Sequence, residues 1–76
     1  MSKQNFAWLL RYRLSPLGVW NNVAIFSRPR KAKRFAEDEE CRRLDWEEFR
    51  HLDEHVFAFE ARAVHRWQIR RYQFDV

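Results

Sequence analysis

Residues 6–26 read FAWLLRYRLSPLGVWNNVAIF and hold the most regular pattern in this 76-residue chain. Apolar residues share the even positions of the first half, namely Trp8, Leu10, Tyr12 and Leu14. This period-two alternation predicts a half-buried strand over residues 6–14. A turn is expected at residues 15–18, because Pro16 presets φ and Gly18 permits a positive φ. Residues 19–26 are expected to form the second strand of a hairpin, with Asn21-Asn22 as a bulge or as the alternative turn.

The middle of the chain is expected to be helical. Ser27 offers a capping oxygen and Pro29 is tolerated in a first turn, which predicts a helix over about residues 28–42. The pattern D-x-x-E at residues 45–48 is typical of a second cap that restarts or continues the helix. Four consecutive acids interrupt the apolar stripe before that point, so a kink or break is expected near residues 40–45.

The C-terminal part, residues 56–74, contains β-branched and aromatic residues and neither Gly nor Pro. Its alternation predicts one long strand or a strand pair, with a bulge or bend at Arg70-Arg71, where the parity of the apolar residues reverses. A helix over residues 54–65 is the alternative, because Glu, Ala, Arg and His are compatible with it. The expected fold class is α+β: a small single domain with an antiparallel β-hairpin, a charged helical middle (kinked or split into two helices) and C-terminal strands that return to the sheet.

Length and composition narrow the class of protein further. A chain of 76 residues has room for one hydrophobic core, so residues 1–76 are expected to form one domain. Aromatic residues make up 17% of the chain, too much for a disordered protein, and the four Trp residues are expected in the core. No apolar run approaches the ~20 residues of a membrane span, and no secretory signal is recognisable. The lone Cys41 cannot form an internal disulfide, which favours a reducing, cytoplasmic location.

Charge is segregated along the chain. Residues 1–34 hold eight basic residues and no acid, residues 35–60 hold ten acids and three arginines, and residues 61–76 hold four arginines and one acid. Basic ends that meet in the fold would create a surface for phosphate or for an acidic protein; alternatively, the three segments neutralise one another. The candidate partner- or phosphate-binding residues are a run around the helix start and four strand arginines: Arg28, Arg30, Lys31, Lys33, Arg34, Arg11, Arg13, Arg70 and Arg71.

Two kinds of ligand fit these cations. Nucleic acid is bound by several cations acting together, and Trp8, Tyr12 or Trp20 on a sheet would stack bases. A protein partner with an acidic surface fits the same run. The acidic stretch would then be a second contact face, of opposite sign, or simply a solvated side of the helix; it consists of Glu37, Asp38, Glu39 and Glu40.

Metal-binding and catalytic alternatives rest on less specific patterns. His51 and His55 have the i, i+4 spacing of two zinc ligands on one helix face, and the further ligands would come from Cys41, Asp53 or His65. A small metal-independent ribonuclease would use a C-terminal cluster of acid–base groups and phosphate-binding cations. That cluster consists of His65, Arg66, Arg70, Arg71 and Tyr72. Because exposed or paired histidines are more common than either site, we expect no metal, no cofactor and no catalytic residue.

The whole pattern resembles the small proteins that phages encode to disable host machinery: a strand over 6–14, a turn over 15–18, a strand over 19–26, a charged helix from Ser27 and a terminal strand to Phe74. Anti-CRISPR proteins and phage inhibitors of bacterial RNA polymerase belong to that set. The resemblance implies a non-enzymatic viral protein of the host bacterial cytoplasm that docks on a host protein or nucleoprotein complex and inhibits it. Such proteins often use acidic surfaces, whereas this chain has a net charge of +4. A small nucleic-acid-binding module is the alternative; no membrane partner is expected, and dimerisation through exposed aromatics stays open.

Overall fold

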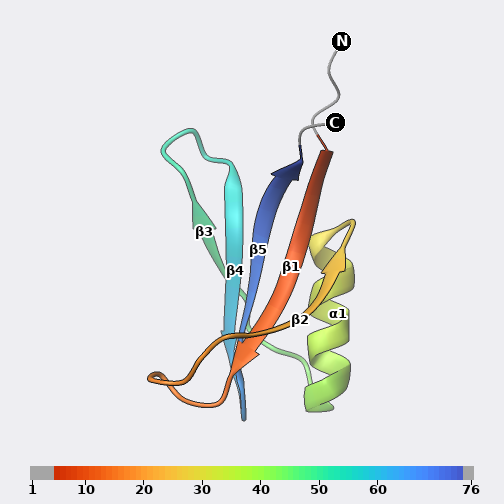
Figure 1. The fold of residues 1–76 in the computed structure, drawn as a ribbon, viewed down its shortest axis with the longest axis vertical. Coiled ribbons are helices and arrows are strands. Elements are labelled where there is room, and N and C mark those ends of the chain that lie inside the picture. Colours follow the sequence, from red (N-terminus) through yellow and green to blue (C-terminus); the bar gives the residue numbers. More distant parts are fainter. Residues whose placement is uncertain (1–4, 75–76) are drawn as a thin grey trace.

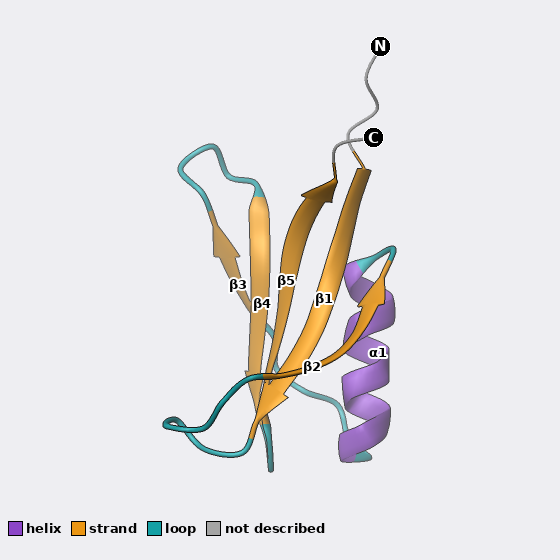
Figure 2. Ribbon diagram, viewed as in Figure 1, coloured by secondary structure: helices purple, strands orange, loops and turns teal. Residues whose placement is uncertain are grey.

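A computed structural model describes residues 5–74 as a five-stranded antiparallel sheet with one helix on one of its faces (Figure 1, Figure 2). In chain order the elements are β1 (Asn5–Arg13), β2 (Asn21–Phe26), α1 (Pro29–Glu40), β3 (Glu47–Arg50), β4 (Val56–Arg62) and β5 (Arg66–Phe74). The strand order is β2-β1-β5-β4-β3, so the first and last strands pair at the centre of the sheet. The predicted α+β class is confirmed. Lys3 and Asp75, which contribute charge at the two ends of the chain, lie outside the described residues.

The N-terminal hairpin forms as predicted. β1 and β2 pair antiparallel from Trp8 opposite Phe26 to Tyr12 opposite Asn21, with one bulge on the way. The predicted turn closes through a hydrogen bond from the N–H of Gly18 to the carbonyl of Ser15, at 2.9 Å, but Gly18 does not use the positive φ expected of it. The second strand begins two residues later than predicted, at Asn21. The alternation of residues 6–14 therefore identified the hairpin from local pattern alone.

The helical middle is a single helix, α1, and at 12 residues it is too short to span a membrane; it is the only helix in residues 5–74. Its N-cap residue is Arg28, which makes no side-chain capping bond, so the prediction of Ser27 as the cap was wrong by one residue. The helix ends at Cys41, whose φ of 57° is left-handed. Ala32 and Ala36, one turn apart, are fully buried. Their small side chains let the helix backbone lie close to the sheet.

The prediction of a second or continued helix over residues 45–52 was wrong. Residues 47–50 form strand β3, where Phe49 lies opposite Ala58 of β4. The segment between α1 and β3 has no regular secondary structure, and the carboxylate of Glu37 accepts a hydrogen bond from the N–H of Leu44 at 2.9 Å. Strand pairing satisfies the backbone groups that a helix would have satisfied internally, so a cap-like sequence does not enforce a helix here.

Residues 56–74 form the predicted strand pair, which excludes the alternative of a helix over 54–65. The predicted bulge at Arg70-Arg71 was wrong, because β5 pairs with β1 without a register shift from Phe74 to Arg66. A central strand with a neighbour on each side cannot slip without breaking both ladders. Consequently Trp67 and Ile69 point toward α1, whereas Tyr72 lies on the other side of the sheet.

The core lies between the sheet and the layer formed by α1 and the segment that follows it. α1 contacts β1, β2 and β5, and Leu44 and Trp46 of the following segment pack on the same core. Trp67 is 3% exposed, and Trp8 packs partly buried against the core. Trp20 belongs to neither group, so the expectation that all four Trp residues are core holds for three of them.

Candidate anion-binding face of the sheet

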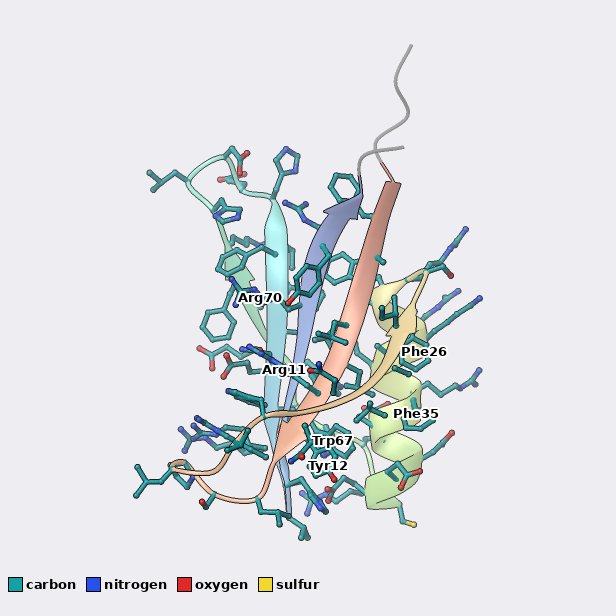
Figure 3. All side chains as sticks on the ribbon, viewed as in Figure 1. Arg11, Tyr12, Phe26, Phe35, Trp67 and Arg70 are labelled. Atoms are coloured by element: carbon teal, nitrogen blue, oxygen red, sulfur yellow. The ribbon has the colours of Figure 1, made fainter. Side chains whose placement is uncertain are left out.

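No helix of the described chain covers the face of the sheet opposite α1, which we call the open face. Cross-strand pairing assigns five arginines to it: Arg11, Arg13, Arg62, Arg66 and Arg70. The same alternation places two carboxylates there, those of Glu47 and Glu60. Figure 3 shows Arg11 and Arg70 over the strands and away from the helix, while Tyr12 and Trp67 lie between the strands and the helix. The open face is therefore predominantly basic.

Three of these arginines form a row across three neighbouring strands. Arg66 of β5 lies directly opposite Arg13 of β1 on one side and Arg62 of β4 on the other. None of the three forms an ion pair with a carboxylate within residues 5–74. Directly opposed like charges destabilise a sheet, so pairing geometry alone gives no reason for this arrangement. The Nε of Arg13 is buried and has no hydrogen-bond partner among the described residues.

Trp20 orders one end of the row. Its ring lies under two guanidinium groups, 4.9 Å from that of Arg11 and 4.5 Å from that of Arg13. Planar guanidinium groups stack on aromatic rings, and such contacts contribute ~0.5–1 kcal/mol each where they are exposed. The residue reaches the sheet from the long turn between β1 and β2. The stack therefore holds the two guanidinium groups in place before any ligand arrives.

A chain of hydrogen bonds crosses the middle of the open face. The Nε of Arg11 donates to Oε1 of Gln68, and Nε2 of Gln68 donates to Oε2 of Glu60 at 2.9 Å. The amide thus separates the carboxylate of Glu60 from Arg11. Farther along β5, Arg70 and the exposed Tyr72 are two positions apart, so both side chains lie on the open face, ~6.6 Å apart along the strand. A cation and an aromatic ring therefore follow one another toward the far end of the sheet.

The structure divides the predicted basic residues between two sides of the sheet. Arg11, Arg13 and Arg70 lie on the open face, whereas Arg71 lies on the helix side, 4.8 Å from the ring of Phe6. Arg62 was not among the predicted binding residues, and Arg66 was predicted only as part of the ribonuclease-like cluster. Arg62 and Arg66 have even numbers, as Arg70 has, and this shared parity was the signal that all three lie on one face. The sequence did not show which strands would lie beside them.

The predicted run at the helix start lies on the other layer of the molecule. Lys33 turns inward, with its Nζ 3.8 Å from the ring centre of Phe59. An open groove of about 1220 Å³ runs between α1 and the segment after it. Its cations are Arg30, Lys31, Lys33, Arg34, Arg42 and Arg43, and its acids are Glu37, Asp38 and Asp45. The groove mixes both signs and has no aromatic lining, so it is a weaker anion site than the open face.

The acidic stretch does not form one continuous outer face. Glu37 turns inward and accepts hydrogen bonds from the N–H of Leu44 and, at 3.4 Å, from Nε1 of Trp46. Glu40 also turns inward, as described below, while Asp38 and Glu39 are exposed. Only two of the four predicted contact acids are therefore available to a partner from outside.

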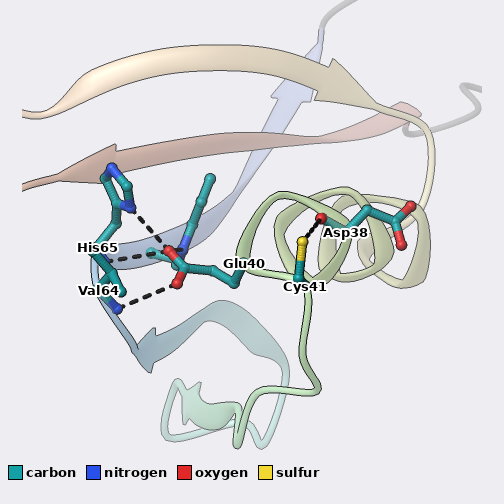
Figure 4. A network of polar contacts seen from close by, with 6 residues as sticks. Asp38, Glu40, Cys41, Val64 and His65 are labelled. Atoms are coloured by element: carbon teal, nitrogen blue, oxygen red, sulfur yellow. Dashed lines mark hydrogen bonds and ion pairs between the residues drawn. The ribbon is translucent and has the colours of Figure 1, made fainter.

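Glu40 joins the end of α1 to the turn between β4 and β5 (Figure 4). Its side chain is 4% exposed and accepts hydrogen bonds from Nε1 of Trp67 at 3.0 Å, from Nδ1 of His65 at 2.9 Å and from the backbone N–H groups of His65 and Val64. Burial raises the pKa of Glu40, but these donors outweigh burial and hold the pKa below its ordinary value. This carboxylate is structural.

The histidines do not assemble into the alternative sites. His51 lies at the end of β3, not on a helix, and its ring stacks on Phe57 at 4.2 Å. Residues 5–74 contain no group of three side chains placed to hold a metal ion. His65 bonds to Glu40 on the helix side, whereas Arg66 and Tyr72 lie on the open face. The ribonuclease-like cluster is thus split between two faces of the sheet.

No protein-family model, curated protein or solved structure matches this chain. Its function is therefore argued from the geometry of its own surfaces. Of these, the open face combines arginines that form no ion pair within residues 5–74 with aromatic rings on the same side of the sheet.

Proposed function

We propose that the protein is a small nucleic-acid-binding module that binds a single strand across the open face of its sheet. The observation that carries this proposal is the row formed by Arg13, Arg66 and Arg62, which has no carboxylate partner within residues 5–74 and ends at the Trp20 stack. A ligand that places phosphates on this row would relieve the repulsion between neighbouring guanidinium groups. Counterion release would add to the affinity.

A single strand fits this surface better than a duplex. Sheets that bind single strands present aromatic rings to stack bases and cations to contact phosphates. The open face offers both along β5, where Arg66, Arg70 and Tyr72 follow one another on the same side of the strand. No helix or ribbon of the described chain projects from this face to enter a groove of duplex DNA, which is how most duplex readers obtain their contacts.

The placement of the acids supports the same proposal. Four of the ten acids of residues 35–60 lie on α1, which packs on the opposite side of the sheet, and two of these four, Glu37 and Glu40, are engaged internally. These four acids therefore lie away from the open face, where Glu47 and Glu60 are the carboxylates and Glu60 is hydrogen-bonded to Gln68. Arginines therefore outnumber carboxylates on the open face by five to two, which favours phosphate.

The test is the salt dependence of binding to fluorescently labelled single-stranded DNA and RNA oligonucleotides, followed by anisotropy. Removing one cation that binds a phosphate is expected to reduce the slope of log K against log salt by ~0.7. Arg66→Gln should weaken binding and flatten the slope. Arg71→Gln removes the same charge from the same strand on the opposite face, and should leave both nearly unchanged. Equal effects of the two variants, or no binding of either oligonucleotide by the parent protein, would refute the proposal.

A second candidate function is docking on a host protein, as the resemblance to phage inhibitors implies. It is favoured by aliphatic side chains that are exposed in the two turns at one end of the sheet. Two of them, Leu14 and Val64, line a pocket of about 240 Å³. The exposed side chains are Leu14 (72%), Leu17 (98%), Val19 (82%) and Val64 (79%). A pull-down from bacterial lysate with and without nuclease separates the two functions. A protein that is retained after nuclease treatment but no longer captured by Leu17→Ser would favour docking.

A further inference from the structure

A second, smaller pocket lies on the helix side of the sheet, away from the open face. It measures about 270 Å³ and lies where the last two turns of α1 pass over β1, β2 and the start of β5. Figure 3 shows two of its rings, Tyr12 and Trp67, together between the strands and the helix, and a third, Phe35, at the helix beside Phe26. The complete lining is Tyr12, Val23, Phe35, Glu39, His65 and Trp67.

Aromatic rings form the walls of this pocket. Tyr12 meets His65 edge to face at 5.1 Å and lies tilted against Trp67 at 5.5 Å. Phe35 contributes from the helix and remains 37% exposed, although it belongs to the apolar side of α1. A ligand in the pocket would cover this ring. The electron-rich faces of such rings attract cations, and quaternary ammonium groups are their best-attested ligands.

A carboxylate completes the pocket. Glu39 follows Phe35 by one helical turn, is exposed, and makes no hydrogen bond or ion pair within the described part of the chain. The adjacent Glu40, by contrast, is fully engaged by Val64, His65 and Trp67. A free carboxylate at the rim repels phosphate and favours a positive charge. The pocket therefore has the opposite preference from the open face.

We propose that this pocket binds a quaternary ammonium group, with Tyr12 and Phe35 beside the methyl groups, the buried Trp67 at the base and Glu39 balancing the charge. The volume lies just below the range typical of drug-sized ligands, which suits a small head group. Two sources share this chemistry: a trimethylated lysine side chain and choline. The pocket lies on a different surface from the nucleic-acid site, and binding in it does not depend on that site.

The test follows the indole N–H signal of Trp67 by ¹H–¹⁵N NMR, after Trp67→Phe has assigned it. The probes are tetramethylammonium chloride, choline and Nε-trimethyl-lysine, with potassium chloride as the salt control. The uncharged isostere 3,3-dimethylbutanol, in which carbon replaces the nitrogen of choline, isolates the contribution of charge. We expect saturable shifts with the ammonium probes and binding of choline at least ~5-fold tighter than of the isostere. The probe that binds more tightly, choline or Nε-trimethyl-lysine, shows which of the two sources of the ammonium group the pocket prefers.

Two variants complete the test. Glu39→Gln should weaken binding of tetramethylammonium several-fold, whereas Asp38→Asn removes the same charge one residue away, outside the pocket, and should not. Equal binding of choline and its isostere, equal effects of the two variants, or no shift beyond that caused by potassium chloride would each overturn the proposal. Far-UV circular dichroism checks that both variants remain folded.

Discussion

Replacing Arg66 by glutamine is expected to stabilise the protein while weakening its binding to nucleic acid. Arg66 lies directly opposite Arg13 on one strand and Arg62 on the other. A directly opposed pair of like charges costs ~0.2–1 kcal/mol, so removing the central charge relieves two such pairs and should raise the free energy of unfolding by ~0.4–2 kcal/mol. Glutamine keeps part of the aliphatic stem, which limits the loss of packing. A gain of ~1 kcal/mol corresponds to a rise in Tm of ~4–8 °C for a domain of this size.

The assay is urea and thermal denaturation followed by far-UV circular dichroism, at ~20 mM and at ~500 mM salt. The gain should shrink at high salt, because mobile ions screen repulsion between half-exposed charges. Arg66→Lys keeps the charge and serves as the control, with no comparable gain expected. A loss of stability in Arg66→Gln at low salt would refute the reasoning, because it would show that the guanidinium group contributes a stabilising contact.

Three further predictions concern stability. Ile69→Ala should lower the free energy of unfolding by ~2–5 kcal/mol, because Ile69 is 0% exposed in the core. A loss below ~1 kcal/mol in urea denaturation would contradict this packing. Cys41→Gly should stabilise by up to ~1 kcal/mol, because glycine adopts the left-handed conformation at φ 57° without the strain of a side chain, and a lower Tm would argue against that origin. Because the folded-state pKa of Glu40 is lowered, its stabilisation is present above the ordinary value of about 4.5 and is lost as the pH falls through the folded value. Wild-type stability should therefore fall between pH ~6 and ~3, and Glu40→Ala should be less stable at pH ~6 and should flatten this dependence. An unchanged pH profile in that variant would contradict the assignment.

The open face and the ammonium pocket make opposite demands on charge, and the sheet separates them. Phosphate is attracted to Arg66 and its neighbours, and a cation to Glu39 on the other side. Variants of one surface should therefore leave binding at the other unchanged. This independence lets each proposal fail without affecting the other.

Elements with a strong local signal could be predicted from the sequence. The alternation around Leu10 identified β1, and Pro29 identified the start of α1 to within a residue or two. The failures lie where tertiary contacts override local preference. Residues 45–48 carry a cap-like pattern, yet β3 forms there because β4 supplies its hydrogen-bond partners. The expected bulge at Arg70-Arg71 is absent because β1 and β4 hold β5 in register from both sides.

The candidate site shows the same division. Alternation along each strand is a local property, so the sequence was sufficient to place Arg11 and Arg13 on one side of their strand. The bulge expected at Arg70-Arg71 obscured the same relation between Arg66 and Arg70, which the unbroken pairing of β5 with β1 reveals. Which strands become neighbours depends on long-range pairing, which no local pattern encodes. The chain closes its sheet by laying its last long strand against its first, and this pairing alone brings Arg66 beside Arg13. The charges were readable in the sequence, but their row exists only because the two ends of the chain meet at the centre of the sheet.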